Sequence, residues 1–234
     1  LLIIGGHEHD FAGIARAHQL AYQAGAGTVL SILPEAVKKH VGVLAECDFL
    51  PSNQGGGFAK EAMNDLLQHM LWADMVLLPG ENGRNSETAI LFEQLLTKSS
   101  VPVTITRDTL ELLQSVPQSF IKRSDTTLVL SLAQLQRLII AAQLPFAIKF
   151  SHTLIQLAEV LHEVSQTIGC SVVTSHYERL IVAHDGKISS TPMEHPESWR
   201  LETSVKAAVW RMQNPTLVFE ALTTAILPLN IRKN

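Results

Sequence analysis

Apolar runs of strand length alternate along this chain with segments in which apolar residues recur at helical spacing. This alternation is typical of a parallel sheet with helices on both faces, so it predicts an α/β fold. The runs predicted as strands cover residues 1–4, 28–33, 75–78, 101–106, 127–130, 171–174 and 180–183. The segments predicted as helices cover residues 12–24, 59–71, 86–98, 110–116, 132–142, 152–167, 200–212 and 215–226, and a further helix is expected to start at Pro34.

The end of the predicted sheet carries a turn signal. Asp185 and Gly186 follow the last predicted strand, and an Asp-Gly pair favours a tight hairpin turn. The chain has 234 residues, of which 46% are hydrophobic, and no repeat or linker-like tract divides it. Because this length can enclose one sizeable core, we predict a single domain over residues 1–234.

Charge and composition narrow the classes of partner. The formal net charge is -4 and the sequence pI is near 6.2, and no block of Lys and Arg occurs. A nucleic acid or an anionic membrane surface is therefore not expected as a partner, and small molecules are. The longest apolar stretch, residues 128–148, is interrupted by glutamines, Arg137 and Pro145, so it is not expected to span a bilayer.

The two cysteines, Cys47 and Cys170, lie far apart in the sequence. Such sparse usage favours a reducing compartment, and we predict a cytoplasmic protein. The first residue is not Met and the chain opens within a strand pattern, so we expect further residues before Leu1.

The first predicted strand ends at Gly5 and Gly6, and a predicted helix follows at residue 12. A strand that turns into a helix at glycines brings backbone N–H groups and the positive end of a helix dipole together. This segment is therefore a candidate anion-binding site.

Two segments of the sequence contain potential metal ligands. His7, Glu8, His9 and Asp10 cluster after the double glycine, but sequence assigns no third ligand from elsewhere, so a solvated loop is the favoured interpretation. His162-Glu163 resembles the start of a zinc-peptidase motif, but Gln166 stands where the second His is required. We predict no metal ligands.

A second glycine-containing loop covers residues 79–84, between a predicted strand and a predicted helix capped by Asn85 or Ser86. Gly80 and Gly83 can bring the backbone close to a ligand, although an ordinary turn explains them equally well. Glu81 opposes phosphate binding there through charge repulsion.

Asp108 follows the predicted strand 101–106, at the carboxyl end where open α/β sheets place functional side chains. The alternative interpretation is that Asp108 only caps the next helix.

These segments together resemble the ADP/ATP-dependent NAD(P)H-hydrate dehydratase family of the ribokinase-like superfamily, which is related to carbohydrate kinases. The residues that carry the resemblance are Gly5-Gly6-His7, Phe11-Ala12-Gly13-Ile14, Gly25-Ala26-Gly27, Leu33-Pro34-Glu35, the run from Ala73 to Arg84 and the run from Pro102 to Leu113.

The resemblance implies a three-layer α/β/α sandwich with a mostly parallel sheet, ADP or ATP with Mg²⁺ and an NAD(P)H-type molecule as ligands, and assembly as a homotetramer. The binding residues that it implies are Gly6, Gly13, Gly80, Asn82, Gly83 and Asp108. Asp108 is also the one candidate for a catalytic residue among them.

The chain departs from the family where the family's chemistry is performed. The family's Gly-Ser/Thr-Gly-Asp, which supplies an anion hole and the catalytic aspartate, falls on Pro196-Glu197-Ser198-Trp199, and no Gly occurs after Lys187. Trp199 cannot accept a proton as a carboxylate does, and Pro196 has no N–H to offer a phosphate. The family's His-Pro-Gly-Glu and Lys-Gly fall on Ser131-Leu132-Ala133-Gln134 and Ser175-His176.

Two function hypotheses follow. The favoured one is a pseudoenzyme that retains the fold, with residual nucleotide or cofactor binding. The alternative is an active nucleotide-dependent dehydratase, a lyase, or a small-molecule kinase with a relocated acid, for which Asp108 and Asp185 are the candidates. A partner subunit that completes another chain's site would explain the same residues.

Overall fold

The computed structural model describes residues 1–41, 46–193 and 196–227. Its centre is a nine-stranded sheet in the order β3-β2-β1-β4-β5-β6-β7-β8-β9. The strands are β1 Leu2–Ile4, β2 Leu30–Pro34, β3 Cys47–Leu50, β4 Val76–Leu78, β5 Val103–Thr106, β6 Thr126–Val129, β7 Ser171–His176, β8 Arg179–His184 and β9 Lys187–Pro192. In this order, all neighbouring strands from β3 through β1 to β7 pair in parallel. The β7–β8 and β8–β9 pairs are antiparallel.

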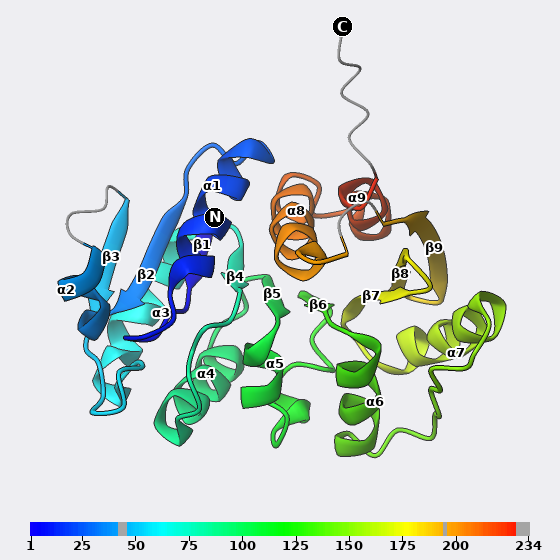
Figure 1. Cartoon of the computed structure of the whole chain (residues 1–234), viewed down its shortest axis with the longest axis horizontal. Helices are drawn as coiled ribbons and strands as arrows, with labels where there is room; N and C mark the ends of the chain where they lie inside the picture. The colour runs from blue at the N-terminus through cyan, green and yellow to red at the C-terminus, as the bar shows by residue number, and fades with distance from the viewer. Residues whose placement is uncertain (42–45, 194–195, 228–234) are drawn as a thin grey trace, which may run out of the picture.

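Helices cover both faces of the sheet (Figure 1). Helices α1, α8 and α9 lie on one face, and α3 to α7 lie on the other, which gives three layers. The helices are α1 Ala12–Gln23, α2 Lys38–Val41, α3 Met63–Trp72, α4 Ser86–Lys98, α5 Asp108–Leu112, α6 Leu132–Ala141, α7 Leu154–Thr167, α8 Trp199–Gln213 and α9 Val218–Ala225. The predicted three-layer α/β/α fold with a terminal hairpin is thereby confirmed.

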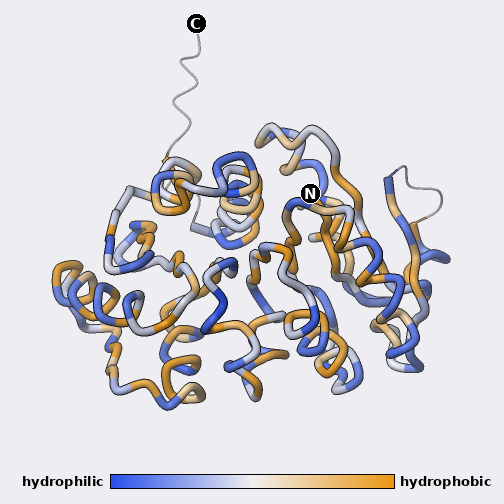
Figure 2. Tube along the Cα trace, turned by 180° about the vertical axis from the view of Figure 1, so that it is seen from behind, coloured by the Kyte–Doolittle hydropathy of each residue, from blue (hydrophilic) through white to orange (hydrophobic). Residues whose placement is uncertain are grey.

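The hydrophobic core has one larger part on one side of the sheet and two smaller parts on the other. The larger part joins α3 to α7 to one face of the strands, and the first smaller part packs α1 and α8 against β1, β2 and β4. The second smaller part packs α8 and α9 against β6, β7 and β8. Helices in Figure 2 alternate between hydrophilic and hydrophobic residues along their turns, as expected for helices with one buried face. Within the described residues, no helix is long and apolar enough to cross a membrane.

Strand β3 was not predicted, and β9 was implied only by the Asp185-Gly186 turn before it, without bounds. Both contain polar residues and lie at the two edges of the sheet, where one side of a strand has no neighbour. The helix expected from Pro34 begins as a 3₁₀ turn over Glu35–Val37, because Pro34 itself still pairs with Leu50 as the last residue of β2.

The strand order reverses between β1 and β4, since β2 and β3 continue on one side of β1 and β4 to β7 continue on the other. The loops that leave the carboxyl ends of β1 and β4 therefore run in opposite directions across the sheet. In open α/β sheets this topological switch point is where ligands bind.

Candidate functional site

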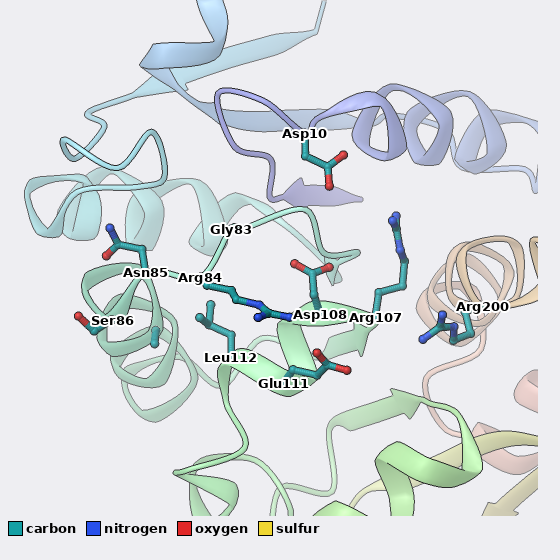
Figure 3. Close-up of a pocket in the computed structure, with 11 residues that line it drawn as sticks. Asp10, Gly83, Arg84, Asn85, Ser86, Arg107, Asp108, Glu111, Leu112 and Arg200 are labelled. Atoms are coloured by element: carbon teal, nitrogen blue, oxygen red, sulfur yellow. The ribbon is translucent and has the colours of Figure 1, made fainter.

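A cleft of about 710 Å³ lies at this switch point. Its walls come from the loops that follow β1, β4 and β5, and from the start of α8 (Figure 3). The lining residues are Asp10, Gly83, Arg84, Asn85, Ser86, Ala89, Arg107, Asp108, Glu111, Leu112 and Arg200. A neighbouring cavity of about 470 Å³ shares Arg107 and Arg200 and reaches Gly13, Glu81 and residues 196–201.

Asp108 accepts two hydrogen bonds from the backbone of the loop that follows β4. Its Oδ1 accepts the N–H of Glu81 at 2.8 Å, and its Oδ2 accepts the N–H of Asn82 at 3.1 Å. Gly80 makes this approach possible: it has a φ of +106°, and a Cβ there would lie 2.2 Å from Asp108 Oδ1. The capping interpretation of Asp108 is wrong, because α5 has Arg107 as its N-cap residue and no side-chain capping bond.

Glu81 occupies the amino end of α1. Its carboxylate accepts the N–H of Gly13 through Oε2 at 2.7 Å and Oε1 at 3.0 Å. Arg107 Nη1 donates to Oε1 at 3.1 Å. The N-cap residue of α1 is Phe11, whose side chain has no hydrogen-bond acceptor. The N–H of Gly13 in the first turn is therefore bonded by the carboxylate of Glu81, 68 residues away in the sequence.

Glu81 has a strained backbone and is buried. Its φ is +62°, and the residue is 5% exposed. Burial raises the pKa of its carboxyl, with a further contribution from nearby Asp10, against the opposing effects of Arg107 and of Gly13 N–H. The anion position predicted after the first double glycine is thus filled by the chain's own carboxylate.

The remaining glycines and Asn82 differ in how they relate to the cleft. Gly13 and Gly83 line the cavities. Gly6 donates its N–H to Gly80 O, so both belong to the framework beneath the cleft. Asn82 is fully buried and donates through Nδ2 to Thr109 Oγ1 at 2.7 Å, while its Oδ1 has no hydrogen-bond partner.

The amino end of α8 forms another wall of the neighbouring cavity. Ser198 is its N-cap residue and donates to Glu202 Oε1 at 3.0 Å. Arg16 of α1 lies 3.9 Å from the same oxygen. A carboxylate of the chain therefore lies at the start of this helix too, and Trp199 stands where the resemblance would require an aspartate.

Sequence reasoning missed Arg107, Glu111 and Arg200 as site residues. Glu111 pairs with Arg137 at 3.1 Å, and Arg200 Nη1 donates to Gln134 at 3.4 Å. In Figure 3, Arg84, Arg107 and Arg200 come to the cleft from three different elements. The position of Arg107 directly after β5 was a usable signal, whereas Arg200 is placed only by the packing of α8.

The other candidates lie apart from this cleft or hold contacts of their own. Asp185 is in the β8–β9 turn, beside the amino end of β7 and thus at the opposite edge of the sheet. Glu8 pairs with Lys39, and the His7 ring contacts Gly55 O. In the part of the chain that the structure describes, no three His, Cys, Asp or Glu side chains are grouped as metal ligands.

No protein-family model and no curated protein matches this sequence. Solved structures do match its fold. A ribokinase-like superfamily protein from Enterococcus faecalis has a TM-score of 0.69 and 15% identity, over 96% of this chain and 76% of that one. A Clostridium difficile phosphomethylpyrimidine kinase has a TM-score of 0.59 and 13% identity, over 96% of each chain.

The Bacillus subtilis ADP/ATP-dependent NAD(P)H-hydrate dehydratase, co-crystallised with ATP and Mg²⁺, has a TM-score of 0.57 and 13% identity. The match covers 96% of this chain and 79% of that one. The fold is therefore ribokinase-like, and at these identities the likeness concerns the fold alone.

Proposed function

We propose that this chain is a ribokinase-like pseudoenzyme that binds a polar small molecule of the NAD(P)H type in the cleft and lacks nucleotide-driven dehydration. The observation that carries the proposal is the Glu81 carboxylate bound to the amino end of α1, together with Glu202 in the first turn of α8. Helix amino ends that face a cleft are suited to anions, and here one accepts an intramolecular carboxylate and the other has a carboxylate in its first turn.

The residues around α8 do not fit the phosphates of ADP or ATP. Pro196 has no N–H, and Glu197 and Glu202 bring negative charge to the same end of the helix. A carboxylate and a phosphate about 4 Å apart repel by several kcal/mol near a protein surface, and the arginines of this cavity, Arg16, Arg107 and Arg200, would have to offset that repulsion. Arg16 lies 3.9 Å from Glu202 and is about half exposed, so solvent screens the charge that it brings to this carboxylate.

The position at which the resemblance requires a proton-accepting aspartate also has no carboxylate. Indole has no carboxylate to accept a proton, so Trp199 cannot act as a general base. Both carboxylate oxygens of Asp108 hold loop N–H groups. These contacts support a structural role for Asp108 instead of the relocated acid that an active enzyme would need.

The main cleft nevertheless suits a polar molecule that carries anionic groups. Arg84 makes no side-chain hydrogen bond or ion pair within the described residues, and it lines the cleft together with Arg107 and Arg200. Guanidinium groups bind phosphates and carboxylates with paired donors. Asp10 adds an acceptor on the opposite wall, where Figure 3 shows it above Asp108.

Thermal melting with ADP, ATP and NADPH, each with and without Mg²⁺, tests the proposal. A ligand that binds only the native state raises the melting temperature, so we expect a rise with NADPH and no rise with ADP or ATP. Arg84→Gln should remove the NADPH effect, whereas Lys60→Gln, which changes an exposed residue outside the cleft, should keep it.

Turnover of hydrated NADPH in the presence of ATP or ADP is the decisive assay, and we expect none above a protein-free control. Measurable turnover would reject the pseudoenzyme and favour the active dehydratase or kinase. A rise of several degrees with ADP or ATP would reject the exclusion of nucleotide from the amino end of α8. No effect of NADPH on melting would reject the binding part of the proposal.

A further inference from the structure

A separate cavity of about 430 Å³ lies between α1 and the strands β2 and β3. It shares Ala12 with the cavity beside the cleft, but its other walls are different. The lining residues are Phe11, Ala12, Ile14, Ala15, His18, Gln19, Ser31, Leu33, Val41 and Cys47. None of these described lining residues is Lys, Arg, Asp or Glu, so the cavity has mostly apolar walls without formal charge.

One wall of this cavity carries an ordered chain of hydrogen bonds. Ser31 Oγ lies 2.8 Å from His18 Nδ1, and His18 Nε2 lies 3.3 Å from Glu46 Oε2. Tyr22 donates its hydroxyl to the same Glu46 oxygen at 2.6 Å. This hydrogen bond is the main reason that the pKa of Glu46 is lowered, so Glu46 remains a carboxylate at neutral pH.

The direction of each bond in this chain follows from the carboxylate. A carboxylate only accepts hydrogen bonds, so His18 donates from Nε2 to Glu46, and the tautomer with its proton on Nε2 leaves Nδ1 as the acceptor. His18 Nδ1 is then an acceptor, and Ser31 donates its hydroxyl hydrogen to it. Ser31 Oγ keeps lone pairs and can only accept a further hydrogen bond.

We propose that this cavity is a binding site, distinct from the cleft, for an uncharged and largely apolar organic molecule that carries one hydrogen-bond donor. The volume and the apolar walls are those of sites for small organic molecules. A charged ligand would lose its hydration without gaining a partner of opposite charge. Ser31 Oγ fixes the orientation by accepting the ligand's hydroxyl or N–H.

Two probes of nearly equal shape test this assignment. Indole presents an N–H donor, and benzofuran replaces it with an ether oxygen. Cys47 lines the cavity and is partly exposed, while Cys170 is buried, so alkylation of Cys47 by N-ethylmaleimide reports occupancy in the native chain. Burial raises the pKa of the Cys47 thiol to about 11, so all rates are compared at one fixed alkaline pH.

We expect indole to slow the alkylation of Cys47 with a saturable concentration dependence. One hydrogen bond corresponds to about a fivefold difference in dissociation constant, so benzofuran should bind about fivefold more weakly. Ser31→Ala removes the acceptor and should make the two probes equal. Its melting temperature and the protection of Cys170 show whether the variant is folded.

Ala15→Phe provides a test of location. Ala15 is exposed on α1 and lines the cavity, so the larger side chain can fill it without entering the core. Gln23→Phe places the same side chain at an exposed position of α1 outside the cavity. Protection by indole should disappear in Ala15→Phe and persist in Gln23→Phe.

The proposal is overturned if neither probe protects Cys47, if both protect it equally in the unmodified chain, or if Ala15→Phe leaves protection unchanged. None of the substituted residues lines the main cleft, so this outcome is independent of whether the chain binds NADPH.

Discussion

At the scale of single residues, Gly80 is a position where both the backbone and its neighbours oppose a side chain. Its φ of +106° and the 2.2 Å separation between a built Cβ and Asp108 Oδ1 both oppose substitution. We predict that Gly80→Ala lowers the free energy of unfolding by about 2 kcal/mol. Urea denaturation measures this as a lower midpoint. Gly27→Ala is the matched control, because nothing lies within 4 Å of its built Cβ, and it should change stability little; equal effects of both substitutions would contradict the argument.

Glu81 gives a pH prediction with a definite sign. Its pKa is raised in the folded chain, so the folded state binds the proton more tightly than the unfolded state does. The stability contributed by this group is present below the ordinary pKa of Glu and is lost as pH rises through the raised value. The unfolding free energy of the unmodified chain, measured relative to Glu81→Gln, should therefore increase as pH falls from 7 toward 4. A decrease would mean that Arg107 and Gly13 outweigh burial.

At the scale of secondary structure, the helices and buried strands could be predicted because their apolar periodicity reports burial directly. The extent of strand β9, which contains Ser189, Ser190 and Thr191, could not be predicted, since an edge strand next to solvent needs no apolar pattern and only the turn before it gave a signal. The cleft was predictable at Asp108 and the glycines of the β4 loop. The contact between Glu81 and Gly13 was not, because it joins residues 68 positions apart, and only the packed sheet brings them together.

Helix α7 begins with a capping box, in which Thr153 accepts the N–H of Gln156 and Gln156 accepts the N–H of Thr153. Thr153→Ala leaves a helix N–H without this acceptor, so we predict a loss of about 1 kcal/mol in unfolding free energy. Thr167→Ala, at the other end of α7, removes an exposed hydroxyl bonded to Glu163 O and should cost less than half as much. Urea midpoints of the two variants provide the comparison, and equal losses would contradict the role of the cap.

At the scale of the whole molecule, a buried arginine joins helix α8 to the sheet. Arg211 of α8 is 4% exposed, bonds Thr127 of β6 and donates to Ser124 O at 2.7 Å. The larger core runs without interruption from β1 and α3 to β8 and α7. The helical layers therefore share one sheet, and separate unfolding of either half would expose apolar residues of the other.

We predict from this continuity that residues 1–234 unfold as a single cooperative unit. Trp72 lies at the end of α3 on one face, and Trp199 and Trp210 lie on α8 on the other, so fluorescence can follow each face separately. Trp72→Phe leaves the reporters on α8, and the double variant Trp199→Phe/Trp210→Phe leaves the one on α3. Each variant's fluorescence should change at the same urea concentration as its far-UV circular dichroism, as two-state unfolding requires. A fluorescence transition that precedes the loss of helicity in one variant would show that the chain contains two independently folding parts.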